Sequence, residues 1–268
     1  MSTTDQTCYP DVQRLKPVRL PTVRLGLLIL LLGLLGADMG NSLYRAKPLF
    51  SSFFTLVTRS YANSIGLIET RKGHLSNHPE LVQTVTDGLK PFDILLIAAP
   101  FKATAMTTPG HYTHVAIWLG DGTDWHQRQW DENPRYKKLL NAVRDGRSVV
   151  QSDRFGVRMG SLDELLNADE IIIFRSDNLQ KTDFYFDRIV ENMGKAYDYN
   201  LDGLNQQQLI CTELVSSIFP DLPVDMTRWL GRSFIVPDQI KQGLEQASNW
   251  HSWFYADAQT EESARLDE

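Results

Sequence analysis

Two kinds of hydrophobic pattern follow one another along this chain, and their order constrains the fold more than any other feature. Short apolar runs bounded by turn residues come first and predict buried strands, at 91–100, 111–120 and 170–176. Longer patterns with helical spacing come second, at 182–196, 211–219 and 237–247. Strands followed by helices predict an α+β domain in which a small antiparallel sheet packs with helices.

The composition is that of an ordinary globular protein. The chain has 268 residues, of which 42% are hydrophobic and 22% are charged, so it can bury one substantial core. A formal net charge of -6 disfavours a nucleic-acid partner, because phosphate contacts need a basic face. We therefore expect no nucleic-acid role.

The N-terminus differs from the rest of the chain. Four basic residues precede an uncharged, Leu-rich run at 25–37. A run of that length is short for a spanning helix and typical of a signal peptide. Gly36 and Ala37 suit a processing site, but Leu35 fits it poorly, so an uncleaved membrane anchor and a buried helix stay as alternatives. We expect export, to the periplasm or to the periplasmic face of the inner membrane.

These patterns divide the chain into four expected parts. They are a basic and hydrophobic leader at 1–38, a helical lead-in at 39–88, the α+β domain at 89–246 and a polar acidic tail at 247–268. No repeat or low-complexity segment interrupts them.

Cys211 is the candidate nucleophile. It stands at the start of an amphipathic helical pattern, and the N–H groups of a helix N-terminus favour the reactive thiolate. In an exported chain Cys8 stays in the leader or on the cytoplasmic side, which leaves Cys211 without a disulfide partner and flags it as reactive. The alternative is a cysteine that only fills space in the core.

Two histidines are candidate partners for this thiol. Along the strand at 114–119, Val115 and Ile117 point one way and His114 points the other. A hairpin with a three-residue loop at 120–122 places His126 diagonal to His114 on the same face. A two-residue loop sends His126 to the opposite face, so the pairing depends on the register.

These residues allow three interpretations. In the first, His114 takes the proton from Cys211, His126 orients the imidazole ring, and the thiolate attacks a carbonyl to form an acyl-enzyme. In the second, His114, His126 and Cys211 bind catalytic zinc, although no CxxC or HExxH motif supports it. In the third, the histidines are hydrogen-bonded sheet residues.

Two sequence motifs, together with the order in which they occur along the chain, resemble those of one protein family. GHYTHVAIWLGDG comes first and GKAYDYNLDGLNQQQLICTELV comes last, which resembles circularly permuted, YiiX/YebB-like members of the NlpC-type papain-like cysteine hydrolases. The spacing from His114 to His126 also resembles the His pair of lecithin:retinol acyltransferase-like proteins. The resemblance covers roughly residues 89–243.

The resemblance implies roles for individual residues. Cys211 is the nucleophile, His114 the base and His126 the third polar member, while Tyr197 lines the substrate site. Asp93 matches the acidic residue that opens the first strand, and Phe92 stands where the family usually has Gly.

The expected function is a thiol-dependent hydrolase that cleaves an amide bond in cell-wall peptides, without a cofactor or metal. Two alternatives stay open. One is a lipid acyltransferase or a hydrolase of lipid amides and esters, with membrane association through 25–37. The other is a catalytically inactive, membrane-tethered binding module.

Overall fold

The computed structural model describes residues 68–260 and 262–265, apart from 104, 106–108, 178, 180, 200, 202–205 and 230–231. The expected leader at 1–38, and the lead-in as far as residue 67, lie outside the described residues. Within the described part, no helix is both long enough and apolar enough to cross a membrane.

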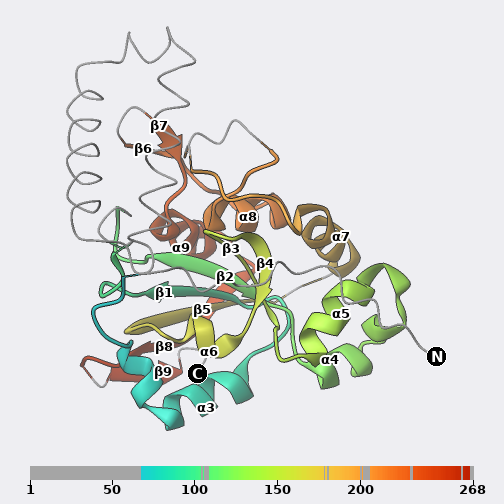
Figure 1. The fold of residues 1–268 in the computed structure, drawn as a ribbon, viewed down its shortest axis with the longest axis horizontal. Coiled ribbons are helices and arrows are strands. Elements are labelled where there is room, and N and C mark those ends of the chain that lie inside the picture. Colours follow the sequence, from blue (N-terminus) through green and yellow to red (C-terminus); the bar gives the residue numbers. More distant parts are fainter. Residues whose placement is uncertain are drawn as a thin grey trace, which may run out of the picture.

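A seven-stranded antiparallel sheet forms the centre of the molecule, in the order β4-β3-β2-β1-β5-β8-β9 (Figure 1). Its strands are β1 (Ile94–Ala98), β2 (His114–Trp118), β3 (Val149–Asp153), β4 (Gly156–Gly160), β5 (Glu170–Ser176), β8 (Trp250–Asp257) and β9 (Glu262–Arg265). A separate pair contains β6 (Thr227–Trp229) and β7 (Arg232–Phe234). The three strands predicted from the sequence are confirmed as β1, β2 and β5, which are neighbours at the middle of the sheet.

Helices cover both faces of this sheet (Figure 1). The α-helices are α3 (Pro79–Gly88), α4 (Gly122–Gln127), α5 (Lys137–Arg144), α6 (Leu162–Leu165), α7 (Thr182–Asn192), α8 (Cys211–Ile218) and α9 (Pro237–Gln246). Short 3-10 helices are η2 (His74–Asn77), η4 (Trp130–Glu132) and η5 (Pro134–Tyr136). The three predicted helical patterns are confirmed as α7, α8 and α9, and the predicted α+β class is correct.

The alternation of side chains along β2 separates two cores. Val115 and Ile117 join the core beneath α7, α8 and α9, whereas Ala116 and Trp118 join the core beside α3 and α6. Because α8 packs across β2 and β3, the residue at its N-terminus is carried to the end of β2 where His114 lies.

The turn before β1 forms although Phe92 stands at the position expected for Gly. Phe92 adopts a φ of 72°, a left-handed conformation that is uncommon for a bulky residue. Its buried ring packs edge-on against Phe186 at 5.0 Å between centroids, and this packing offsets the local strain. Asp93 then forms an ion pair with Arg175 at 2.6 Å.

The segment after β2 is a helix, so the predicted hairpin is wrong. The Asp121 carboxylate accepts the N–H groups of Thr123 and Asp124, and the Asp124 carboxylate accepts the N–H of Asp121. This capping box starts α4 directly after the turn. Trp125 is fully buried and its indole N–H donates to the Leu119 carbonyl, which holds α4 against the end of β2.

The expected boundaries of the domain also need correction. The sequence predicts a polar tail at 247–268, but residues 250–257 form β8, which pairs along the whole of β5 and buries Trp253 and Phe254. The end of the lead-in is likewise part of the fold, because Leu75 and Val85 are buried in the core beside α3.

Candidate active site

Cys211 is the first residue of α8. The N–H of Ile210 donates to the Glu213 carboxylate at 2.9 Å, which caps the helix, and Leu214 and Val215 anchor it in the core. The Thr212 hydroxyl donates to the Ile235 carbonyl at 2.8 Å. These contacts fix the thiol at the base of a cavity, where its residue is 8% exposed.

Burial controls the protonation of this thiol more than the helix terminus does. Burial raises the pKa of Cys211 to about 11, while backbone N–H groups of Val115 and Thr212 act to lower it. The expectation that the helix N-terminus yields a resting thiolate is therefore not met. The resting site holds a neutral thiol, and removal of its proton needs a base.

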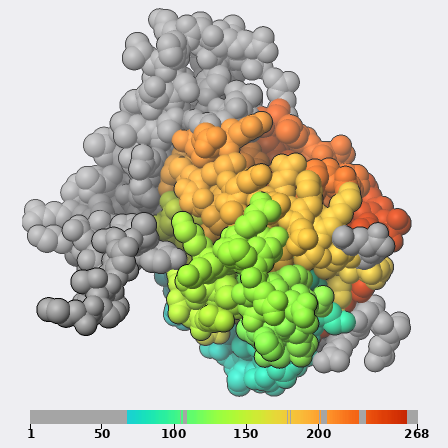
Figure 2. All heavy atoms as spheres, turned by 90° about the vertical axis from the view of Figure 1, so that its right-hand side faces the viewer, coloured from blue at the N-terminus to red at the C-terminus, as the bar shows by residue number. Residues whose placement is uncertain are grey.

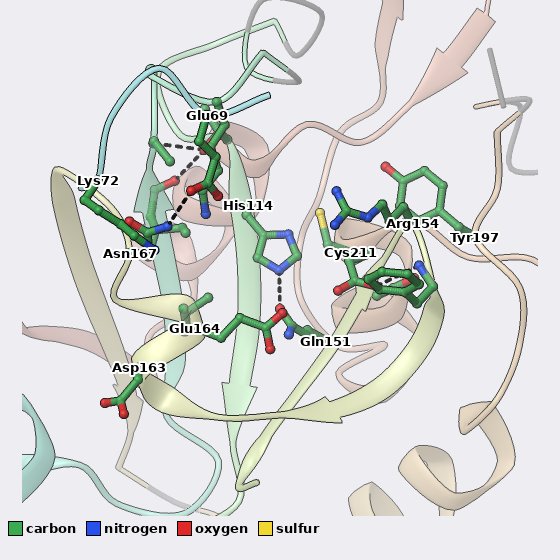
Figure 3. A pocket seen from close by; sticks show the side chains of 18 residues that line it. Glu69, Lys72, His114, Gln151, Arg154, Asp163, Glu164, Asn167, Tyr197 and Cys211 are labelled. Carbon is green, nitrogen blue, oxygen red and sulfur yellow. Dashed lines mark hydrogen bonds between the residues drawn. The ribbon is translucent and has the colours of Figure 1, made fainter. Parts of the chain in front are cut away.

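His114 is the candidate base, and it lines the same cavity as the thiol. Its Nε2 lies 2.9 Å from Oε1 of Gln151. An amide oxygen only accepts, so Nε2 carries the hydrogen and Nδ1 keeps its lone pair. Figure 3 shows the imidazole between the Gln151 amide and the Cys211 sulfur. Burial lowers the pKa of His114, which keeps the ring neutral and able to accept a proton.

Gln151 is the site residue that the sequence analysis missed. It lies on β3, next to β2, and is buried. Its Nε2 lies so close to Gly160 that a Cβ added there would come within 2.4 Å of it. The absence of a side chain at Gly160 therefore leaves room for the Gln151 amide. Recognition of 149–153 as a strand beside 114–118 was the signal that could have identified this residue.

His126 does not take the place expected for it. It lies on α4, and 82% of its side chain is exposed. The segment that contains α4 is on the side of the molecule that faces the viewer in Figure 2. Nδ1 of His126 is 3.1 Å from the Asp131 carboxylate, and His126 is not among the residues that line the cavity. The expected Cys211–His114–His126 arrangement is thus wrong in geometry, because α4 replaces the second strand of the hairpin.

The cavity around Cys211 and His114 has a volume of about 540 Å³ and carries charges of both signs (Figure 3). Its ionisable lining includes Glu69, Lys72, Lys102, Asp153, Arg154, Asp163 and Glu164. Tyr197 lines the same cavity, where the resemblance implies it, and packs against Tyr199 with 5.1 Å between ring centroids. Burial raises the pKa of Tyr197, so its hydroxyl stays neutral and can donate a hydrogen bond.

The described residues contain no group of three or more His, Cys, Asp and Glu side chains placed to hold a metal ion. The three ligands of the zinc interpretation are not together, since His126 lies apart from Cys211 and His114.

Comparison with known families adds to this geometry. Residues 89–263 match the model of a family described as "Permuted papain-like amidase enzyme, YaeF/YiiX, C92 family". The chain belongs to this family. Membership in the permuted papain-like amidases agrees with the order of the two motifs and with a sheet packed against helices. The narrower kinship to NlpC-type and lecithin:retinol acyltransferase-like proteins stays a prediction. No curated protein matches the chain.

Proposed function

We propose that this permuted papain-like amidase is a thiol-dependent enzyme in which Cys211 is the nucleophile and His114 the general base. The observation that carries the proposal is the alignment of thiol, imidazole and Gln151 amide within one cavity. Gln151 takes the orienting role that the sequence assigned to His126. Tyr197 is the proposed substrate-binding residue.

The chemistry follows from the protonation of the resting pair. Nδ1 of His114 takes the thiol proton as the sulfur attacks the amide carbonyl. His114 then donates this proton to the leaving amine, the C–N bond breaks, and an acyl-enzyme remains. Water attacks the thioester with His114 again as base, which releases a carboxylic acid and restores the thiol. In this proposal the backbone N–H of Cys211, at the N-terminus of α8, stabilises the developing oxyanion.

The proposed substrate is a peptide amide of the cell wall, which the protein would cleave outside the cytoplasm. The basic, Leu-rich leader supports export to the periplasm or anchoring at the inner membrane. The cavity lining supports a peptide, because a lining with both carboxylates and ammonium groups suits a substrate that carries both charges.

The test uses the full chain and purified peptidoglycan fragments. Wild-type protein is expected to release amino or carboxyl groups from the fragments, and Cys211→Ala is expected to abolish the release. Chelators are expected to have no effect. Wild-type protein that leaves the fragments intact would contradict the cell-wall assignment.

A lipid substrate is the second candidate, and Phe155 is the observation that favours it. Phe155 lines the cavity with 65% of its surface exposed, and the guanidinium carbons of Arg154 and Arg158 lie 4.8 Å and 5.6 Å from its ring centroid. An exposed ring in the cavity lining suits an acyl chain. Vesicles with lipid esters or amides test this candidate: loss of acyl chains there, with intact peptidoglycan fragments, would select it. Inactivity on both substrates would select the inactive binding module.

A further inference from the structure

Lys102 lines the same cavity as Cys211 and His114, on a backbone segment that is firmly held. Its N–H donates to the Ala99 carbonyl at 3.0 Å, and it pairs through an isolated β-bridge with Glu69. The next residue, Ala103, donates its N–H to the Ile68 carbonyl at 3.1 Å. Lys102 is therefore a fixed part of the cavity wall.

Among the described residues no carboxylate forms a close ion pair with Lys102, although Glu69 and Glu164 act on it through their charges. The contact that the structure gives its ammonium is with the ring of Phe101, 5.7 Å from the centroid. Burial lowers the pKa of Lys102, because half-buried surroundings disfavour the charged form. A lysine kept in such a place without an ion pair is costly to stability.

Three acidic residues that line the same cavity interact with other groups. Arg158 forms ion pairs with both Asp153 and Glu164, and the Glu69 carboxylate accepts a hydrogen bond from Asn167 at 3.1 Å. The positive charge of Lys102 is thus available to a molecule that enters the cavity.

The electric field of Lys102 reaches the reacting groups. Its charge contributes to lowering the pKa of His114, although burial is the larger cause. Because Lys102, His114 and Cys211 line one cavity, a group bound at Lys102 occupies the same cavity as the bond that Cys211 attacks.

We propose that Lys102 is a specificity-determining residue that binds a carboxylate of the substrate beside the scissile amide. This inference rests on the proposed amidase function and names a substrate class for it. Glu69 and Glu164 also act on Lys102 through their charges, so a monoanion is accepted more readily than a dianion such as phosphate.

Two alkylating agents of similar size test the charge preference without a known substrate. Iodoacetamide is neutral and iodoacetate carries one carboxylate. In both reactions the S–C bond forms, the C–I bond breaks, iodide leaves and the thiol proton passes to His114. The measured quantity is the ratio of the iodoacetate rate to the iodoacetamide rate at Cys211, read by mass spectrometry. This ratio corrects for any change in the reactivity of the thiol itself.

The proposal predicts that Lys102→Met lowers this ratio by about tenfold, the effect of one charge at close range in a partly buried site. Lys102→Arg, which keeps the charge, is expected to retain most of the wild-type ratio. Lys72→Met is the matched control, because it removes the same charge from the same cavity at an exposed position where solvent screens it. An equal fall in both methionine variants, or no fall in Lys102→Met, would overturn the proposal.

Competition in the wild-type protein provides a second measurement that needs no variant. Acetate is expected to slow alkylation by iodoacetate at lower concentration than phosphate does. Stronger protection by phosphate would overturn the assignment to a carboxylate. Failure of the amidase proposal gives a different result, because the rate of alkylation by iodoacetamide would then be the same in His114→Ala and in the wild type.

Discussion

At the scale of single residues, protonation decides how the site works. Cys211 and His114 are both held neutral by burial, which raises the pKa of the thiol and lowers that of the imidazole. A neutral pair has no preformed thiolate, so the proposed reaction depends on proton transfer from sulfur to Nδ1 during attack. Gln151, an uncharged residue, orients the ring through this hydrogen bond, and its effect of raising the pKa of His114 is smaller than the lowering by burial.

The stability of the protein should reflect the lowered pKa of His114. In the unfolded chain the His114 imidazole titrates at about pH 6.5, and in the folded protein it titrates at lower pH. The neutral His114 therefore contributes to the free energy of unfolding above about pH 6.5. This contribution is lost as the pH falls from that value through the folded-state pKa. Denaturant titrations of wild type and His114→Asn at several pH values measure it. A difference between the two proteins that is independent of pH would contradict the buried, neutral imidazole.

A substitution that adds a charge at position 151, with little change of shape, tests the Gln151–His114 contact. Gln151→Glu places a carboxylate beside Nε2 and is expected to raise the pKa of His114 by about one unit or more. The acidic limb of the alkylation rate of Cys211 should then move to higher pH by the same amount, since the base is lost to protonation earlier. An acidic limb at the wild-type position would contradict the contact.

At the scale of elements, β3 and α4 decide which residues meet at the site. The sequence was sufficient to predict β1, β2, β5 and the helix that starts at Cys211, because their apolar patterns are long and regular. It was not sufficient for the third site residue, since Asp121 caps a helix where the glycine turn predicted a hairpin. Gln151 lies on a strand with polar residues at 151–153, and its partner His114 is distant in the sequence.

Gly160, on β4, should affect the reactivity of Cys211 because its lack of a side chain leaves room for the Gln151 amide on β3. In Gly160→Ala the new Cβ would lie 2.4 Å from Nε2 of Gln151, so the amide must move away from His114. Because the group that moves is a side chain, we expect the fold to persist and the alkylation rate of Cys211 to fall. Circular dichroism and the labelling rate test this together. A folded variant with the wild-type labelling rate would show that Gln151 does not position the ring.

At the scale of the whole molecule, the C-terminal residues complete the sheet. β8 lies between β5 and β9, and it buries Trp253, Phe254 and Ala256. Each large apolar side chain contributes about 1.5–3 kcal/mol on burial, against a total stability of about 5–15 kcal/mol for a domain. The periodicity of the sequence did not indicate this strand, because a bulge opposite Ile173 and Phe174 interrupts its alternation.

Truncation tests whether residues 247–268 are part of the sheet or a polar tail outside the fold. Removal of residues 247–268 is expected to prevent folding, because it exposes the edge of β5 and deletes part of one core. Removal of residues after 260, which keeps β8, is expected to leave a folded protein with a lower Tm. The two truncations are compared by thermal unfolding. Cooperative unfolding of the shorter protein would contradict the role of β8.

The central claim is that His114 activates Cys211, and the rate of alkylation by iodoacetamide at neutral pH tests it most directly. The measurement compares wild type, His114→Ala and His126→Ala, with Cys211 labelling read by mass spectrometry. We predict that His114→Ala lowers the rate by about tenfold or more. We predict that His126→Ala, changed on the exposed face of α4, keeps the wild-type rate. Equal rates in wild type and His114→Ala would contradict the account.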